Sequence, residues 1–316
     1  MPYFQDVLKR VDGVQRRHPP AAFAFAVNKK YGDDRGGNLA ALVAYYGFLS
    51  MFPLLLAVFT IATYALRGHP ATIHSLTNHL GEVPVIGPSL SQIDNQSHPL
   101  GGSVLALVVG IVGLVLGAMG LAQSLQHVMN EVWGVPGRER AGYATRLARS
   151  AGWYAAFGIG IVASTFVTSL SSVLDWGPAG PVLSSLPAAL INVAVFTLSF
   201  QILSPHGVTW RMQWRGAVVA GLAWTVLTTV GVSLVTHQLK HASALYGTFG
   251  SIIGLIGFLY VAARGSIYGC EMNAVRHHKL WPRSLVPPLT AADKQALIDL
   301  ARKEERMAGE TVRVEF

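Results

Sequence analysis

The residues best suited to chemistry lie at the end of the last long apolar stretch, residues 245–274. Glu271 is a carboxylate there, Arg264 lies seven residues earlier, and Tyr268 lies between them. Spacings of three and four place all three on one face of a helix. A carboxylate at the end of a membrane helix is costly unless it is paired or reaches the interface. Glu271 is therefore predicted to be an ion or proton gate, a clasp that binds Arg264 or a neighbouring backbone, or an exposed interfacial acid.

A row of glycines precedes this acid on the same stretch. Its members are spaced three, four and three apart and are Gly247, Gly250, Gly254 and Gly257. In lipid, small residues let a neighbouring helix approach closely. The row is predicted to be a helix-packing seam, either within the chain or between copies in a homo-oligomer.

Polar residues in the other apolar stretches have two possible uses. Asn192, Gln201 and Thr225 are examples, with serines and threonines at 164–172. Such residues either line a hydrophilic cavity or hold helices together through hydrogen bonds. Pro53 lies within the first apolar stretch, where it predicts a kink that serves gating or only packing.

Motifs for metal or covalent chemistry are missing from the sequence. His237 and His241 are four apart, but no carboxylate is spaced with them, and the single cysteine, Cys270, cannot form a thiolate cluster. No nucleophile elbow, phosphate-binding loop or dinucleotide-binding glycine pattern occurs. We expect no metal, no cofactor and no enzymatic activity.

Composition is typical of a membrane protein. Only 13% of the 316 residues are charged, against about 25% in soluble domains. Six segments approach the roughly 20 apolar residues that a crossing needs. They are residues 39–66, 101–125, 150–174, 182–203, 216–236 and 249–270. The predicted fold is all-α, a polytopic membrane protein with six transmembrane helices within residues 39–271.

The distribution of basic residues predicts the orientation. Of the 24 Lys and Arg residues, only Arg67 and Lys240 fall in the connections on the opposite side from the termini. Because Lys and Arg accumulate on the cytoplasmic side, both termini are predicted to be cytoplasmic. The net charge of +8 then reflects topology. Anionic lipid headgroups are the expected partners, and nucleic acid is not required.

Two cytoplasmic segments flank the predicted membrane domain. Residues 1–38 are basic and amphipathic, and a Pro-Pro step divides them into two predicted helices. These helices are predicted either to lie on an anionic membrane surface or to pack on the protein itself. In the polar tail, residues 272–316, Thr290 and Asp293 resemble a capping box that opens a helix over residues 291–308.

Several longer motifs occur in a fixed order along the chain. They are AALVAYYGFLSMFPLLLAV at 40–58, NEVWGVPGRER at 130–140, GAVVAGLAW at 216–224, LYGTFGSIIGLIGFLYV at 245–261 and GCEMNA at 269–274. Together they resemble the YihY/BrkB family over about residues 30–280. The shared positions are Tyr45, Pro53, Asn130, Trp133, Tyr246, Gly247, Glu271 and Asn273. Arg264 and Tyr268 stand where the family is expected to be apolar.

The resemblance implies a bacterial inner-membrane protein with six helices. The expected function is a transporter or exporter of a small or amphipathic substrate, lipid-like ones included. The alternative is a non-transporting scaffold, or an envelope-integrity or virulence-associated factor. Some family members carry an older ribonuclease label. The predicted inner loops do not support it, because Glu131, Glu139, His127 and His206 show no metal-ligand spacing.

Overall fold

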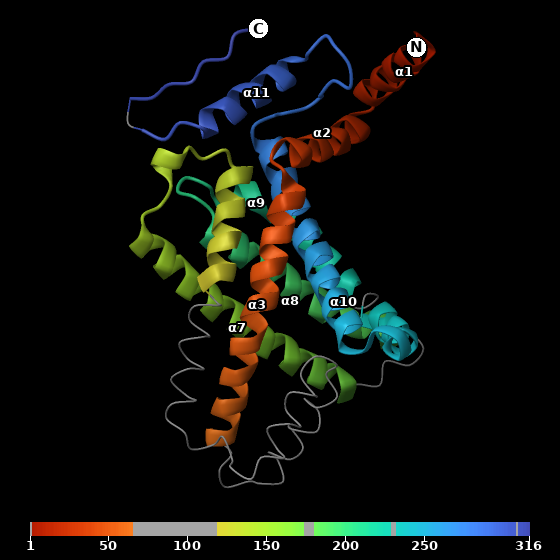
Figure 1. Cartoon of the computed structure of the whole chain (residues 1–316), viewed down its shortest axis with the longest axis vertical. Helices are drawn as coiled ribbons and strands as arrows, with labels where there is room; N and C mark the ends of the chain where they lie inside the picture. Colours follow the sequence, from red (N-terminus) through yellow and green to blue (C-terminus); the bar gives the residue numbers. More distant parts are fainter. Residues whose placement is uncertain (1, 66–118, 174–179, 229–231, 308) are drawn as a thin grey trace. The chain divides into compact units, whose positions relative to one another are not determined.

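The computed structural model describes residues 2–65, 119–173, 180–228, 232–307 and 309–316. Its regular elements in those residues are all helices (Figure 1), so the predicted all-α class is confirmed for this part of the chain. The chain divides into two compact units. The first unit comprises Met1–Ala41, Ala122–Leu227 and Ala262–Phe316, and the second comprises Leu42–Leu121 and Thr228–Val261.

The helices begin and end near sequence signals. Their bounds are α1 Pro2–Arg17, α2 Pro19–Asp33, α3 Gly36–Ala65, η1 Gly137–Glu139, α7 Tyr143–Val173, α8 Gly180–Leu203, α9 Trp210–Val226, α10 Val232–His277 and α11 Ala291–Lys303. Residues 119–132 are also helical. The Pro-Pro step opens α2. The predicted capping box at Thr290 and Asp293 is confirmed, and its helix ends at Lys303 rather than at residue 308.

The described apolar helices overlap the predicted segments but differ from them in their bounds. α9 ends at Val226 and α10 begins at Val232, both within the predicted segment 216–236. α10 is one helix from Val232 to His277, where the sequence analysis ends one segment at residue 236 and begins the next at 249. Residues 237–248 contain no proline and several good helix formers, which explains a continuous helix. Residues 101–118 of the second predicted segment lie outside the described residues. The count of six crossings stays a prediction.

In the first unit, α8 packs against both α7 and α9. A Cβ at Gly160 of α7 would lie 2.4 Å from Val195 Cγ2, and one at Gly221 of α9 would lie 2.8 Å from the Val193 backbone. Only glycine fits at these two points without a shift of the neighbour. Small residues therefore allow both close helix contacts.

Hydrogen bonds between polar side chains reinforce these contacts. Asn192 on α8 donates to the Thr225 hydroxyl on α9 at 2.9 Å. Trp153 on α7 donates to the Ser199 hydroxyl on α8, also at 2.9 Å. Of the two uses predicted for polar residues, helix association is the one that these side chains serve. The side chains of residues 164–172 lie outside those described.

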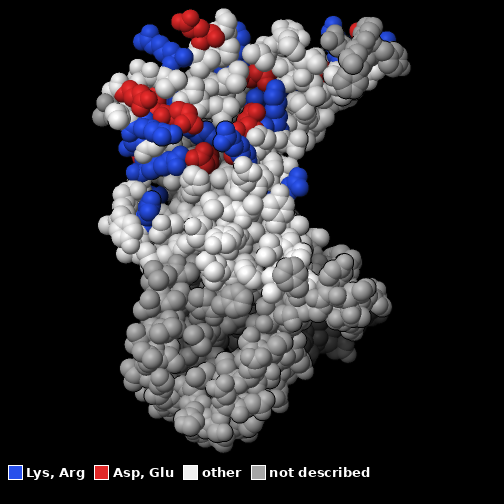
Figure 2. Space-filling view, in the orientation of Figure 1, with Lys and Arg blue, Asp and Glu red and all other residues white. Residues whose placement is uncertain are grey.

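Large apolar side chains point outward from α7, α8 and α9. Ile159, Leu190 and Val226 are exposed by 70%, 71% and 62%. Figure 2 shows the charged residues gathered instead where α2 and α11 lie in Figure 1. Exposed large apolar side chains on long apolar helices fit contact with lipid.

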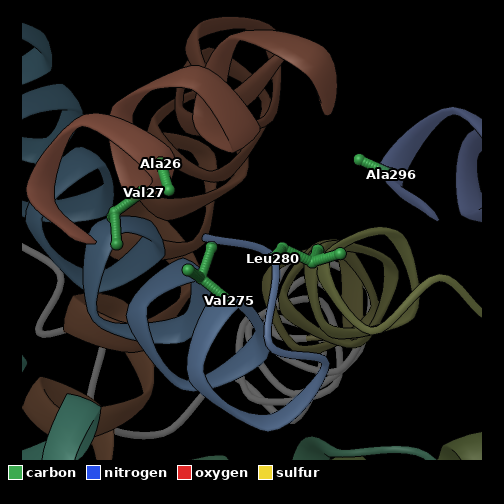
Figure 3. Close-up of a cluster of buried hydrophobic side chains, with 5 residues drawn as sticks. All are labelled: Ala26, Val27, Val275, Leu280 and Ala296. Carbon is green, nitrogen blue, oxygen red and sulfur yellow. The ribbon is translucent and has the colours of Figure 1, made fainter. Parts of the chain in front are cut away.

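The end of α10 packs with the terminal helices α2 and α11. A buried apolar cluster joins these elements (Figure 3). It consists of Ala26 and Val27 of α2, Val275 of α10, Leu280 just after α10, and Ala296 of α11. The second N-terminal helix therefore packs on the protein itself, one of the two predicted alternatives. This layer positions the site described next.

α1 contacts the rest of the unit through its polar face. Gln15 donates to the Arg283 carbonyl at 2.8 Å, and the Leu285 amide donates to Asp12 at 2.9 Å. Three valines of this amphipathic helix, Val7, Val11 and Val14, are exposed instead.

Candidate functional site: a buried chain of ion pairs

The centre of the site is the ammonium group of Lys30, near the end of α2. Its Nζ lies 3.0 Å from Glu271 Oε2 on α10 and donates to the Val132 carbonyl at 2.9 Å. It also donates to Asp34, one helical turn along from Lys30. Lys30 thus joins α10, α2 and helix 119–132 through one charged group.

Further ion pairs continue from Asp34 to other elements. Lys303 Nζ, at the end of α11, lies 2.6 Å from Asp34 Oδ1 and 3.4 Å from Glu131 Oε2. Arg140 then donates to Glu131 Oε1 at 2.6 Å. We name this series the ion chain. Its members, in order, are Glu271, Lys30, Asp34, Lys303, Glu131 and Arg140, with alternating charge.

Two members of the ion chain, Lys30 and Glu131, are held in their charged forms. Burial alone would lower the pKa of Lys30, but the charges of Glu271 and Asp34 outweigh it and raise that pKa above its ordinary value. Burial would raise the pKa of Glu131, but the hydrogen bond from Arg140 and the charge of Lys303 hold it below its usual range. Both groups are therefore charged at neutral pH.

Glu271 is the most deeply buried member, with none of its surface exposed. Lys30 compensates its charge at 3.0 Å. Neither carboxylate oxygen, however, accepts a well-directed hydrogen bond from the described residues. Burying a carboxylate with too few hydrogen bonds is costly. Ionised Glu271 therefore raises the free energy of the folded protein.

A pocket of about 210 Å³ opens beside the ion chain. Its lining includes four members of the chain, Lys30, Asp34, Glu131 and Lys303, together with Trp133. The pocket gives small solutes a place next to these charged groups. No group of three or more metal-binding side chains occurs within the described part of the chain.

The two residues predicted to share a face with Glu271, Arg264 and Tyr268, act separately from it. Arg264 lies over the rings of Tyr31 and Tyr268, at 5.6 and 5.7 Å from their centroids. Those rings stack at 4.3 Å, and the Tyr268 hydroxyl donates to Asn28 at 2.9 Å. Arg264 thus makes a cation–π contact. The predicted clasp at Glu271 has Lys30 as its cation, not Arg264.

Asn273 binds the first turns of α9. It accepts a hydrogen bond from the Gly216 amide at 2.8 Å and donates to the Gln213 carbonyl at 2.7 Å. A Cβ on Gly216 would lie 1.9 Å from the Gly269 carbonyl oxygen, so α9 and α10 cross in backbone contact. The side chain of Asn273 fastens this crossing, two residues along α10 from Glu271.

A second polar centre fixes α11 to α2. Asp293 receives Arg283 Nε at 2.7 Å, Lys29 Nζ at 2.9 Å and the Ser284 hydroxyl at 2.6 Å. Burial would raise the pKa of Asp293, but the hydrogen bonds from Ser284, Arg283 and Lys29 hold it well below its ordinary value. Asp293 therefore stabilises the fold above its unfolded pKa of about 4, and this stabilisation is lost as the pH falls further.

The other residues singled out from the sequence are not members of the ion chain. Trp133 is buried, and its ring meets those of His277 and His278 at 5.7 and 6.0 Å. Asn130 accepts the Val135 amide through its carbonyl at 2.9 Å. Tyr45 is 58% exposed in the second unit. Pro53 and Tyr246 lie within α3 and α10, but their side chains are outside those described.

Two glycines of the predicted seam, Gly254 and Gly257, have no close neighbour among the described residues. A Cβ at Gly254 or at Gly257 would meet none of their atoms within 4 Å. Gly247 lies within α10, but its surroundings are outside those described, and Gly250 is half-buried. The close crossing is instead made by Gly269, which the sequence analysis did not single out. The role of the seam stays a prediction.

These features define an integral membrane protein. Within the described residues, two helical stretches are long and apolar enough to cross a membrane, Leu186–Leu203 and Ile252–His277. A family model described as Virulence factor BrkB matches residues 27–292. The chain belongs to this family, as the motifs predict.

Relatives agree with an inner-membrane location. Inner membrane protein YhjD of Escherichia coli is 21% identical over 85% of this chain and 85% of its own length. UPF0761 membrane protein RSc1559 of Ralstonia nicotianae is 23% identical over 90% of this chain and 66% of its own length. The ribonuclease-like protein YfkH of Bacillus subtilis is 25% identical over 79% and 93%. No solved structure matches the chain. This protein is an inner-membrane protein.

Proposed function

We propose that this protein is a six-helix transporter of a small or amphipathic substrate, with both termini in the cytoplasm. The observation that carries the proposal is the ion chain, which links α10, α2, α11 and helix 119–132 through largely buried charges. Apolar side chains of similar volume would stabilise the folded protein at least as well as these buried ion pairs do. A switching role therefore explains the charges better than a purely structural one.

In this proposal the ion chain closes the cytoplasmic end of the substrate pathway. Neutralising Glu271, by a proton or during substrate passage, leaves Lys30, Lys303 and Arg140 against only two acids. Lys30 on α2 then loses its ion pair with Glu271 on α10, which weakens the contact between these two helices. The elements then separate, and the adjacent pocket opens toward the pathway.

Proteoliposomes test this function directly. The probes are an NBD-labelled phospholipid, followed by dithionite bleaching, and the entrapped amphipathic dye rhodamine 6G. The wild-type protein is expected to move at least one probe, and Glu271→Gln is expected to fold but to lose that movement or its pH dependence. If neither probe moves with the wild-type protein, or the variant transports as the wild type does at every pH, the proposal is contradicted.

A second candidate is a homo-oligomeric scaffold. It is favoured by the face of α10 at Gly254 and Gly257, where an added Cβ would meet no described atom. Close contact with a second copy would use that space. Gly254→Leu should then lower the oligomeric state in nanodiscs, whereas a transporter without this interface would keep it.

The proposal assigns no enzymatic activity, no cofactor and no nucleic-acid partner. The ribonuclease wording belongs to the relative YfkH. Near the ion chain, Glu131 is engaged by Arg140 and Lys303, so it is a poor general base. Cleavage of RNA by the purified protein, abolished by Glu131→Gln, would reverse this assignment.

A further inference from the structure

One face of α9 carries an exposed apolar stripe. Val219, Leu222 and Val226 are spaced three and four apart, and all are exposed. The opposite face is buried and consists of Gln213, Gly216, Ala217, Ala220 and Gly221. Because the protein is integral to the membrane, the exposed stripe contacts lipid acyl chains.

The same face continues into two arginines toward the start of α9. Arg211 and Arg215 extend the four-residue spacing back from Val219. The guanidinium of Arg215 lies 4.9 Å from the ring centroid of Trp214, and that of Arg211 lies 5.8 Å from Trp210. Both tryptophans are exposed. Each cation is thus held over an aromatic ring at the end of a lipid-facing stripe.

These arginines lack acidic partners within the described residues. No carboxylate of that part of the chain comes within ion-pair distance of either guanidinium, whereas Arg138, Arg140 and Arg283 all have such partners. The counter-ions of these two neighbouring positive charges therefore come from outside the described part of the protein.

We propose that Arg211 and Arg215 bind the phosphate of an anionic phospholipid. At 1.5 Å rise per residue, Arg215 lies about 6 Å beyond Val219, so its long side chain reaches the headgroup layer. Guanidinium groups bind phosphate through paired hydrogen bonds. Trp210 and Trp214 occupy the interface, which tryptophan prefers. The proposal rests on the six-helix topology proposed above, in which α9 crosses the membrane, but it does not depend on transport.

Native mass spectrometry of the delipidated full-length protein tests this site. The protein is titrated with phosphatidylglycerol, cardiolipin or phosphatidylcholine, and the bound lipids are counted. The variant is Arg211→Gln with Arg215→Gln. The matched control is Arg302→Gln with Arg306→Gln, which removes two exposed arginines of the C-terminal region.

The wild type and the control are expected to bind the anionic lipids in preference to phosphatidylcholine. The α9 variant should bind them roughly 30-fold more weakly, from the attraction typical of two basic residues near an anionic surface, with unchanged phosphatidylcholine binding. The proposal is overturned if the α9 variant binds anionic lipid as the wild type does. It is equally overturned if the control loses as much, or if the wild type shows no anionic preference.

Discussion

Replacing Lys30 with methionine is expected to lower the free energy of unfolding by about 3–5 kcal/mol, because it leaves Glu271 buried without its cation. Asp34 loses one of its two lysines in the same step but keeps Lys303. The measurement is SDS-induced unfolding in mixed micelles, followed by tryptophan fluorescence. Lys30 is nine-tenths buried, so solvent does not screen the loss.

Two further variants separate the charge effect from lost packing. Lys30→Met combined with Glu271→Met should recover most of the stability, since it replaces a buried pair with apolar side chains. Lys9→Met removes an exposed lysine of α1 and should change little. If the single variant unfolds like Lys9→Met, or the double variant is no more stable than the single, Glu271 is not held by Lys30.

The next largest effect is expected at the crossing of α9 and α10. Gly269→Ala would place a Cβ 2.5 Å from the Gly216 carbonyl oxygen, a backbone atom that cannot rotate away. The helices must separate, which also stretches the two hydrogen bonds of Asn273. The expected loss is about 1–3 kcal/mol from overpacking, with more from the stretched bonds. The same unfolding measurement detects it.

Gly257→Ala is the matched control on the same helix. Its Cβ would meet no described atom within 4 Å. Because alanine favours a helix over glycine, this variant should be neutral or more stable by roughly 0.5–1 kcal/mol. Equal losses at both positions would mean that the crossing at Gly269 is no tighter than the open face.

Local sequence signals predicted the elements of this protein well. Proline marked the start of α2, and the capping box marked the start of α11. Both depend on residues within one turn, so the sequence alone specifies them. The continuity of α10 was missed because the hydrophobic pattern weakens over residues 237–248, although helix-forming residues continue.

For contacts between distant elements, the sequence predicts that a partner exists but not which residue it is. A carboxylate at Glu271 requires a partner, and Arg264 is the cation that helical spacing places on the same face. The structure supplies Lys30 from α2 instead, because α2 packs on the end of α10. Likewise the glycine row suggested close packing, but the facing residue decides where it occurs. Gly216 opposite Gly269 meets that condition.

The most direct test of the proposed function is whether the ion chain opens. Spin labels at Ala24 of α2 and Tyr143 of α7, both exposed in the first unit, report the separation of α2 from the elements that follow helix 119–132. The background is Cys270→Ala, and distances are measured by double electron–electron resonance in nanodiscs. The account predicts one distance for the otherwise wild-type protein and a second, longer population with Glu271→Gln. One unchanged distance in both folded proteins would contradict it.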